Sequence, residues 1–402
     1  MSDAVVRSGA QDAVADRYGE VMMRAFGTPK RVLVRGEGCR VQDADGAEYV
    51  DLLGGIAVNA LGHAHPEVCA TIAQQVGTLG HVSNFFATPA QVTLAERLRE
   101  ITSPSARVFF ANSGSEANEA AFKLARLTGR PRIIAMEGGF HGRTLGALAL
   151  THNPAYREPF EPLPGGVEFV PYGDIDALRA VMGPDVAAVV LEPVQGENGV
   201  VEPPQGYLTQ VRELTRQHGS LMWVDEIQTG MGRCGDWLAS AEVDADIVTL
   251  AKGLAGGFPI GACVAAGDAA DLLQPGQHGS TFGGNPVAAH AALTVMHVIE
   301  RDGLLEHATR VGSFLADSIM DLQHPIIESV RGRGLLRGIV LTQDVAPKVA
   351  DAALDAGYLV NAPRPSVVRI APPLIITEND VAGFVEALPS ILDAAGTGGH
   401  HG

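Results

Sequence analysis

Lys252 stands where an apolar run ends and a glycine-rich stretch begins, in DADIVTLAKGLAGGFPIGACVAA, residues 244–266. A lysine at the end of a buried strand is costly to ionise, so burial raises the fraction of free amine, the form that attacks carbonyl carbons. Asp225 ends another apolar run, LMWVDEI, 27 residues earlier. If both runs are strands of one open α/β sheet, both side chains lie at its carboxyl edge, where such sheets bind ligands.

A lysine for an aldehyde and a carboxylate for a ring nitrogen are the two groups that pyridoxal phosphate requires of a protein. Lys252 would form a Schiff base with the aldehyde, and Asp225 would keep the ring nitrogen protonated. In FFANSGSEANEA, the stretch Ser113, Gly114 and Ser115 offers N–H groups and hydroxyls to a phosphate at a helix start. Taken singly, the lysine could mark a strand's exit to solvent and a serine could be a plain helix cap.

Seven short apolar runs would position these side chains. Several are apolar throughout, which is typical of strands covered by helices on both faces. They alternate with helical patterns, and this alternation predicts an α/β fold with a mostly parallel sheet. The runs are residues 106–112, 132–136, 167–172, 186–194, 220–227, 246–252 and 260–266.

Helical patterns lie between and after these runs. SEANEAAFKLARLTG predicts a helix with Ser113 or Ser115 as its cap and Gly129 at its end. From Asn285 onward, two longer helical patterns lead into an α+β tail.

The chain is long enough for more than one domain. We expect a large domain over residues 59–288 and a smaller α+β domain over residues 289–402. Residues 1–58 contain a hairpin-like pattern that turns around Asp45 and Gly46, but they are too few to form a core alone. They are therefore expected to pack on the smaller domain.

The composition favours an enzyme that acts on small molecules. The chain has 402 residues, of which 46% are hydrophobic and 19% charged, so it can bury large cores. Its 46 acidic and 29 basic residues leave a formal charge of −17, which repels nucleic acids and anionic membranes. The N-terminus lacks a signal-peptide pattern and no apolar run reaches roughly 18 residues, so neither secretion nor membrane spanning is expected. Four cysteines without CxxC spacing predict a reducing, cytoplasmic location.

Other motif-like stretches lack the context that would give them a function. The chain has no G-x-x-x-x-G-K-[ST] stretch and no GxGxxG after a strand, so P-loop and dinucleotide sites are not indicated. His63 and His65 stand two apart in LGHAHP, but no further metal ligands can be placed, and a metal site is not predicted.

Eight motifs, in the same order as in the family, make the sequence similar to the class III (ω-amino acid) aminotransferases of fold type I. They extend through nearly the whole chain, and together they are specific for the family, though less so for the substrate. The resemblance implies pyridoxal phosphate, the fold type I architecture with a seven-stranded sheet and a homodimer with shared active sites. The motifs are LLGGIAVNALGHAHP, NSGSEANEAAFKLAR, FHGRT, LEPVQGENGV, VDEIQTGMGR, LAKGLAGGFPIGA, GSTFGGNP and VRIAPPL.

The resemblance assigns roles around the cofactor ring. It implies that Lys252 forms the Schiff base and later shuttles the proton, while Asp225 pairs with the pyridinium. Gln228 is expected to bond the ring hydroxyl and Phe140 to stack on the ring. Glu192 is expected near the cofactor, without an assigned role.

The resemblance also places the phosphate. Ser113, Gly114 and Ser115 are expected to hold it, and Ser115 replaces the threonine or alanine of many relatives without removing a backbone donor. Thr281 of GSTFGGNP is expected to reach the phosphate of the neighbouring subunit's cofactor, with Ser280 beside it at the substrate. Each active site would then need a dimer.

Two arginines are expected to select the substrates, because a planar guanidinium binds a carboxylate through two hydrogen bonds. Arg143 resembles the family's contact for the α-carboxylate of acetylornithine and the side-chain carboxylate of glutamate. Arg369 resembles the arginine that receives the α-carboxylate of glutamate. Glu197 would pair with Arg369 in the first half-reaction and move away in the second, a two-state switch that the ligand biases.

The activity that we expect is transfer of the δ-amino group of N-acetylornithine to 2-oxoglutarate, in arginine biosynthesis. Ornithine aminotransferases, as the resemblance has it, place tyrosines where this chain has Ile56 and Ala87, and a less polar pocket suits an acylated amine. The alternatives are transfer from ornithine, succinyl-diaminopimelate or 4-aminobutyrate, or glutamate-1-semialdehyde aminomutase activity. A binding protein that kept the fold and lost the chemistry would have lost the lysine or the acid, and both are present.

Overall fold

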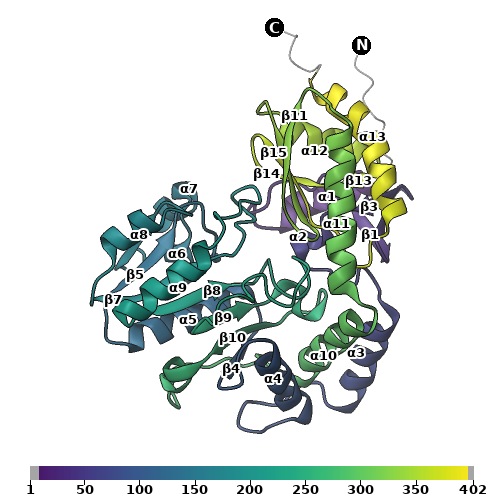
Figure 1. Cartoon of the computed structure of the whole chain (residues 1–402). Coiled ribbons are helices and arrows are strands. Elements are labelled where there is room, and N and C mark those ends of the chain that lie inside the picture. The colour runs from purple at the N-terminus through teal and green to yellow at the C-terminus, as the bar shows by residue number, and fades with distance from the viewer. Residues whose placement is uncertain (1–8, 397–402) are drawn as a thin grey trace.

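The protein, seen here in a computed structural model that describes residues 9–396, is built around a seven-stranded sheet (Figure 1). The strand order is β4-β10-β9-β8-β7-β5-β6. β10 is antiparallel to both of its neighbours, whereas β9, β8, β7, β5 and β6 pair in parallel. The predicted mostly parallel sheet is confirmed, and each strand lies within one predicted run. The strands are β4 (Arg107–Ala111), β5 (Arg132–Met136), β6 (Val167–Val170), β7 (Val186–Leu191), β8 (Leu221–Asp225), β9 (Ile247–Leu250) and β10 (Gly261–Ala265).

Helices cover both faces of this sheet, which explains the apolar runs. Along β5, Ile133 and Ala135 pack with α5 (Gly114–Leu127), while Ile134 and Met136 pack with α9 on the other face. Because successive side chains of a strand alternate between faces, every position must be apolar. Further helices around the sheet are α4 (Pro89–Ile101), α6 (Leu145–Leu150), α8 (Ile175–Val181) and α9 (Tyr207–His218).

A second sheet, order β11-β12-β15-β14, is antiparallel throughout. It lies with the C-terminal helices at the opposite end of the molecule from α4 (Figure 1). Together they share a core that includes Leu315, Ile339 and Phe384. The elements are β11 (Ile327–Arg333), β12 (Leu336–Leu341), β14 (Asn361–Arg364), β15 (Val367–Ile370), α11 (Leu304–Asp321), α12 (Ala346–Asp355) and α13 (Glu378–Gly396).

A third sheet joins the N-terminal strands to the C-terminal part of the chain. β2 (Arg40–Asp43) and β3 (Glu48–Asp51) form the predicted hairpin, and Gly46 in its turn has a φ of +89°. β3 also pairs in parallel with β13 (Tyr358–Leu359), and β1 (Leu33–Glu37) completes the sheet.

One helix contributes to two cores. Ala288 and Ala289 of α10 (Pro286–Arg301) pack near the large sheet, whereas Val298 and Ile299 belong to the core of the C-terminal elements. The division into residues 1–58, 59–288 and 289–402 stays a prediction. The remaining elements are α1 (Gly9–Val21), α2 (Gly54–Ala57), α3 (Pro66–Thr78), α7 (Pro154–Arg157), η1 (Glu158–Phe160), η2 (Lys252–Ala255) and η3 (Gly267–Asp271).

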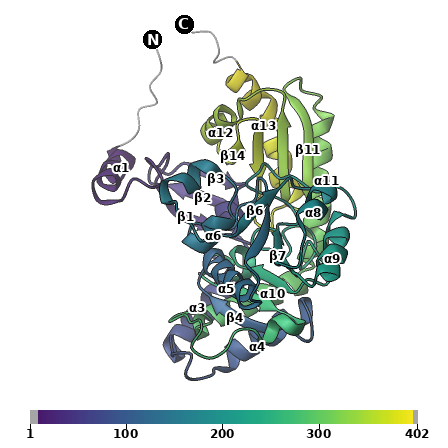
Figure 2. The same cartoon turned by 90° about the vertical axis from the view of Figure 1, so that its left-hand side faces the viewer.

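Two further observations concern the outside of the molecule. Figure 2 shows α1 set apart from the elements that surround the sheets. Within residues 9–396, none of the helices combines the length and the apolar character that crossing a bilayer requires.

Candidate active site

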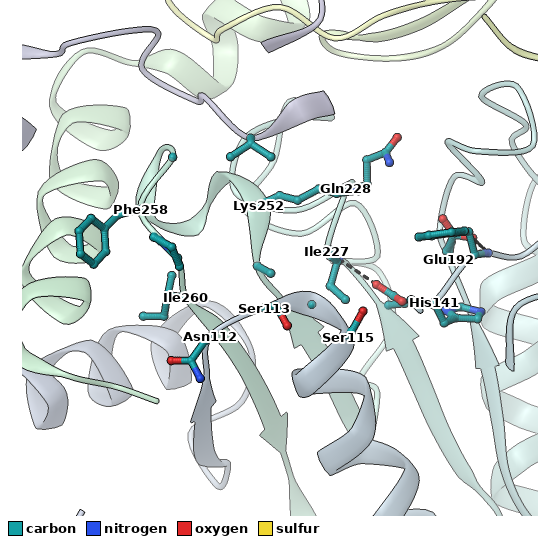
Figure 3. Close-up of a pocket in the computed structure, with 18 residues that line it drawn as sticks. Asn112, Ser113, Ser115, His141, Glu192, Ile227, Gln228, Lys252, Phe258 and Ile260 are labelled. Carbon is teal, nitrogen blue, oxygen red and sulfur yellow. Dashed lines mark hydrogen bonds and ion pairs between the residues drawn. The ribbon is translucent and has the colours of Figure 1, made fainter. Parts of the chain in front are cut away.

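Lys252 and Asp225 line the same cavity, which has a volume of about 370 Å³. β8 and β9 are parallel neighbours with Asp225 opposite Thr249, so the carboxylate and the chain just before Lys252 meet at one edge of the sheet. Figure 3 shows Lys252 above the start of α5, where Ser113 and Ser115 lie. The fold thus brings together two side chains that are distant in the sequence.

Three donors hold the carboxylate of Asp225. Its Oδ1 accepts the N–H of Ile227 at 3.0 Å, and its Oδ2 accepts Nδ2 of Asn118 and Nδ1 of His141, each at 2.8 Å. Because a carboxylate only accepts, Nδ1 of His141 carries a proton. Burial favours a lower pKa for His141, but its hydrogen bond to Asp225 and the charge of that carboxylate outweigh burial and raise the pKa. Asp225 is therefore fixed in orientation.

Lys252 is held in an unusual backbone conformation two residues after β9. Its φ is +43°, in the left-handed region, and residues strained in this way concentrate at functional sites. Burial lowers the pKa of Lys252 below its ordinary value, although the nearby carboxylate of Glu197 favours the charged form. A lowered pKa leaves more of the amine in the nucleophilic form.

The start of α5 offers free donors to an anion. Ser113 is the cap, since its Oγ accepts the N–H of Glu116 at 3.2 Å. The N–H groups of Gly114 and Ser115 find no acceptor within residues 9–396. They lie at the positive end of a 14-residue helix, and a Cβ on Gly114 would come within 2.8 Å of Cδ1 of Ile227. The start of α5 can therefore hold a phosphate.

Phe140 and Glu192 form one side of the cavity. Oε1 of Glu192 accepts the N–H of Phe140 at 3.0 Å. Burial raises the pKa of Glu192 to about 7. Sequence reasoning left Glu192 without a role, and the contact shows that it fixes the backbone that carries the aromatic ring.

Arg369 and Glu197 form an ion pair next to the cavity. Nη1 of Arg369 also donates to Oε1 of Gln228 at 3.2 Å, and Nε2 of Gln228 donates to Glu197 at 3.4 Å. Burial favours a higher pKa for Glu197, but the charge of Arg369 and its hydrogen bond lower the pKa. Gln228 lines the cavity, so it connects the ion pair to the space beside Lys252.

Arg143 lies outside the lining of this cavity. Its side chain is exposed, and its guanidinium carbon is 3.5 Å from the centre of the Tyr156 ring and 5.7 Å from that of Phe140. The backbone N–H of Arg143 donates to Oγ of Ser115 at 3.3 Å. The structure therefore places Arg143 next to the cavity's aromatic wall, where a cation–π contact orients it.

Ser280 and Thr281 line a second hollow, a groove of about 1110 Å³. Asn112, which lines the first cavity, connects it to Ser280, since its Nδ2 donates to Oγ of Ser280 at 3.2 Å. Thr281 is exposed. Within one chain, these two residues are not brought to Lys252.

The two histidines of the LGHAHP motif have separate surroundings. Nε2 of His63 is 2.8 Å from Oδ2 of Asp51, while Nδ1 of His65 is buried and has no partner in the described part of the chain. Residues 9–396 contain no group of three or more histidine, cysteine or acidic residues arranged for a metal ion.

Sequence reasoning missed Asn118 and His141, the two side chains that hold Asp225. Both carried a local signal. Asn118 is a polar residue on the buried face of α5, among alanines, and His141 directly follows Phe140. Neither signal points to Asp225, because the partners are 107 and 84 residues apart in the sequence.

The family model of the class III aminotransferases matches residues 22–392. The chain is a class III aminotransferase. It is 55% identical to the acetylornithine aminotransferase of Mycolicibacterium smegmatis over 94% of this chain and 98% of that protein. The solved ornithine aminotransferase of Toxoplasma gondii superposes with a TM-score of 0.91 at 33% identity, covering 96% of each chain. The solved N-acetylornithine aminotransferase of Stenotrophomonas maltophilia gives 0.80 at 38% identity, covering 92% of this chain and 98% of that one.

Class III aminotransferases use pyridoxal phosphate, and the residues present fit this group. Lys252 offers an amine of lowered pKa, and Asp225 offers a fixed carboxylate in the same cavity. The two N–H groups at the start of α5, which have no acceptor among the described residues, match a phosphate in charge and in hydrogen bonding.

Proposed function

We propose that this aminotransferase moves the δ-amino group of N2-acetylornithine to 2-oxoglutarate. The products would be N-acetylglutamate 5-semialdehyde and glutamate, in arginine biosynthesis. The identity of 55% to an acetylornithine aminotransferase, over nearly the full length of both proteins, is the observation that supports it most. The ornithine aminotransferase that shares the fold is more distant, at 33% identity.

Each residue of the cavity would have a separate role in a ping-pong reaction. Pyridoxal phosphate, when bound, supplies an electron sink for the carbon that carries the transferred nitrogen. Lys252 would hold the cofactor through its aldehyde and would serve as the base for the proton of the δ-carbon. Asp225 would keep a proton on the ring nitrogen, Phe140 would pack against the ring and Gln228 would bond the ring hydroxyl.

The two substrates differ in charge at the end far from the reacting amine. We assign the α-carboxylate of N-acetylornithine and the side-chain carboxylate of glutamate to Arg143, and the α-carboxylate of glutamate to Arg369. Ser280 is assigned to the substrate as well. With Glu197 on Arg369, the second positive charge is neutralised while the donor reacts, and 2-oxoglutarate must displace this pairing.

A half-reaction titration tests the proposal. Purified holoenzyme is mixed with N-acetylornithine or with ornithine, without 2-oxoglutarate, and the loss of visible cofactor absorbance is followed. We expect kcat/KM for N-acetylornithine to exceed that for ornithine by at least about 10-fold, because a pocket built for an amide leaves a charged amine unpaired. Equal or higher values for ornithine, succinyl-diaminopimelate or 4-aminobutyrate would refute this substrate assignment. An aminomutase would turn over glutamate-1-semialdehyde without any 2-oxoglutarate.

Ile56 and Ala87, which stand where ornithine aminotransferases are expected to have tyrosines, are exposed in the single chain. Ile56 has 41% of its surface exposed and Ala87 is exposed as well, and neither lines the cavity. Their influence on donor choice therefore stays a prediction, to be judged by the same titration.

We further propose that the enzyme is a cytoplasmic homodimer. A dimer is supported by exposed apolar side chains near Thr281, since Phe85 and Phe282 are 92% and 58% exposed. In the dimer, Thr281 would reach the phosphate held by Ser113, Gly114 and Ser115 of the neighbouring subunit. A reducing compartment suits the free thiols of the described chain.

Mixed dimers test the shared site. Lys252→Ala and Thr281→Asp are each expected to be nearly inactive, the second because a carboxylate would repel the phosphate. After subunit exchange, each mixed dimer would contain one intact site, so activity should return to about one quarter of the wild-type rate. An equal mixture that stays inactive, although subunit exchange is shown by differently tagged chains, would contradict Thr281 acting across the dimer.

A further inference from the structure

The loop of residues 195–201 carries Glu197, and its own backbone closes it. Gln195 and Val201 exchange two backbone hydrogen bonds, of 2.9 and 3.1 Å. Within the loop, Val200 is fully buried with a φ of +60°, which is rare for a β-branched residue. Such a conformation persists only where the surroundings over-determine it, so contacts from outside the loop must hold it.

Asn198, directly after Glu197, is the junction of these contacts. Its Nδ2 donates to Oε1 of Gln195 at 2.8 Å, and its Oδ1 accepts Nη2 of Arg364 at 2.6 Å. A Cβ on Gly138, which has a φ of +78°, would lie 2.3 Å from Nδ2 of Asn198. The amide of Asn198 is thus enclosed between the loop, the segment that precedes Phe140 and a strand of the C-terminal sheet.

The short strand β14 contacts both sides of the ion pair, Arg369 directly and Glu197 through the neighbouring residue Asn198. β14 begins at Asn361, whose Oδ1 accepts Nε of Arg369 at 3.1 Å, and it ends at Arg364. Asn361 is opposite Arg369 in the pairing of β14 with β15. The first residue of β14 therefore fixes Arg369, and the last fixes the neighbour of Glu197.

We propose that Asn198 and Arg364 are positioning residues that bias the Glu197–Arg369 pair toward its closed arrangement. The inference rests on the proposed function, in which 2-oxoglutarate must displace Glu197 from Arg369. A contact present only in the closed arrangement favours the donor half-reaction and opposes binding of the dicarboxylate by the same free energy. Asn198 and Arg364 would then set the balance between the two substrates.

Arg364 does not need to touch a substrate for this role. Its guanidinium contacts Asn198, and Arg364 does not line the cavity that contains Lys252. Arg331 contacts the same loop from β11, the strand at the other edge of this sheet, since its Nε donates to the carbonyl of Gly199 at 2.9 Å. That contact joins a side chain to the main chain of the loop, whereas the Asn198–Arg364 contact joins two side chains.

The test compares Asn198→Ala and Arg364→Met with wild type in both half-reactions. We expect the dissociation constant of 2-oxoglutarate from the amino form to fall by about 5-fold to 10-fold, and kcat/KM for N-acetylornithine to fall by a similar factor, as for the loss of one hydrogen bond. Arg364→Lys, which can still donate to Asn198, should restore part of both. The double variant should match Asn198→Ala, because Asn198→Ala already removes the contact with Arg364 together with the hydrogen bond to Gln195.

Hydrogen exchange gives a readout that does not depend on activity. The amides of Gln195 and Val201 should exchange faster in Asn198→Ala and Arg364→Met than in wild type, with or without cofactor. Arg310→Met is the matched control, since Arg310 is an exposed arginine that pairs with Glu378 away from this loop. It should change neither the exchange nor the substrate balance.

Two results would overturn the inference. Equal losses in both half-reactions would make the contact purely structural, and weaker binding of 2-oxoglutarate in Arg364→Met alone would make Arg364 a direct substrate ligand. Failure of the proposed function looks different, because wild-type enzyme would then not react with N-acetylornithine. In that case the exchange experiment and the balance between 2-oxoglutarate and the accepted donor still decide the role of Asn198.

Discussion

Replacing Lys252 with alanine is expected to remove the visible, borohydride-reducible absorbance of the holoenzyme and to lower kcat/KM by at least about 10⁴-fold. In the proposed function, both the covalent attachment of the cofactor and the proton transfer at the δ-carbon would depend on this one amine, and positioned acid–base groups alone contribute about 10²-fold to 10⁴-fold. The measurements are the absorbance spectrum before and after borohydride, and the initial rate of the donor half-reaction.

Lys348→Ala is a suitable control, since Lys348 is an exposed lysine of α12. It should keep the wild-type spectrum and rate. If a borohydride-reducible absorbance survived in Lys252→Ala, another amine would carry the cofactor and the assignment of Lys252 would be wrong.

Replacing Asp225 with asparagine is expected to lower kcat/KM by roughly 10²-fold to 10⁴-fold, because removal of one partner of a buried charge pair costs about 3–5 kcal/mol. The ring nitrogen would lose its proton, and with it much of the ring's capacity to take up electrons. The variant should still bind cofactor through Lys252 and the start of α5. The kinetics and the retained cofactor are measured on the same preparation.

A reconstitution experiment separates this electrostatic role from a structural one. Asparagine also places an amide N–H₂ against the donors His141 and Asn118, so some loss of stability is expected. A cofactor methylated at the ring nitrogen carries a permanent positive charge and should restore part of the activity of Asp225→Asn. Wild-type kinetics in a folded Asp225→Asn would contradict the role of the carboxylate.

The large sheet could be predicted because its signal is local. Each strand is an apolar run with helices on both sides, and β7 (Val186–Leu191) is buried at every position. The cap of α5 was ambiguous between Ser113 and Ser115, since both precede the helical pattern and only the backbone conformation distinguishes them.

The contacts that tune the site could not be predicted, because they join distant segments. Asn198 and Arg364 are 166 residues apart, and neither has a pattern that identifies the other. Gln228 was expected at the ring hydroxyl, but sequence gave no sign that its amide also bridges Arg369 and Glu197. Thr281 raises a different problem, since its expected partner belongs to a second chain.

The segment that carries Lys252 joins two neighbouring antiparallel strands, β9 and β10, with Leu250 opposite Ala262. A segment whose two ends are anchored in neighbouring strands has little freedom to move. If Lys252 carries the cofactor as proposed, displacement of its amine toward the substrate would come from rotation within the four-carbon stem of the lysine. Each turnover would then return the nitrogen to the same starting position, with the main chain between β9 and β10 in place.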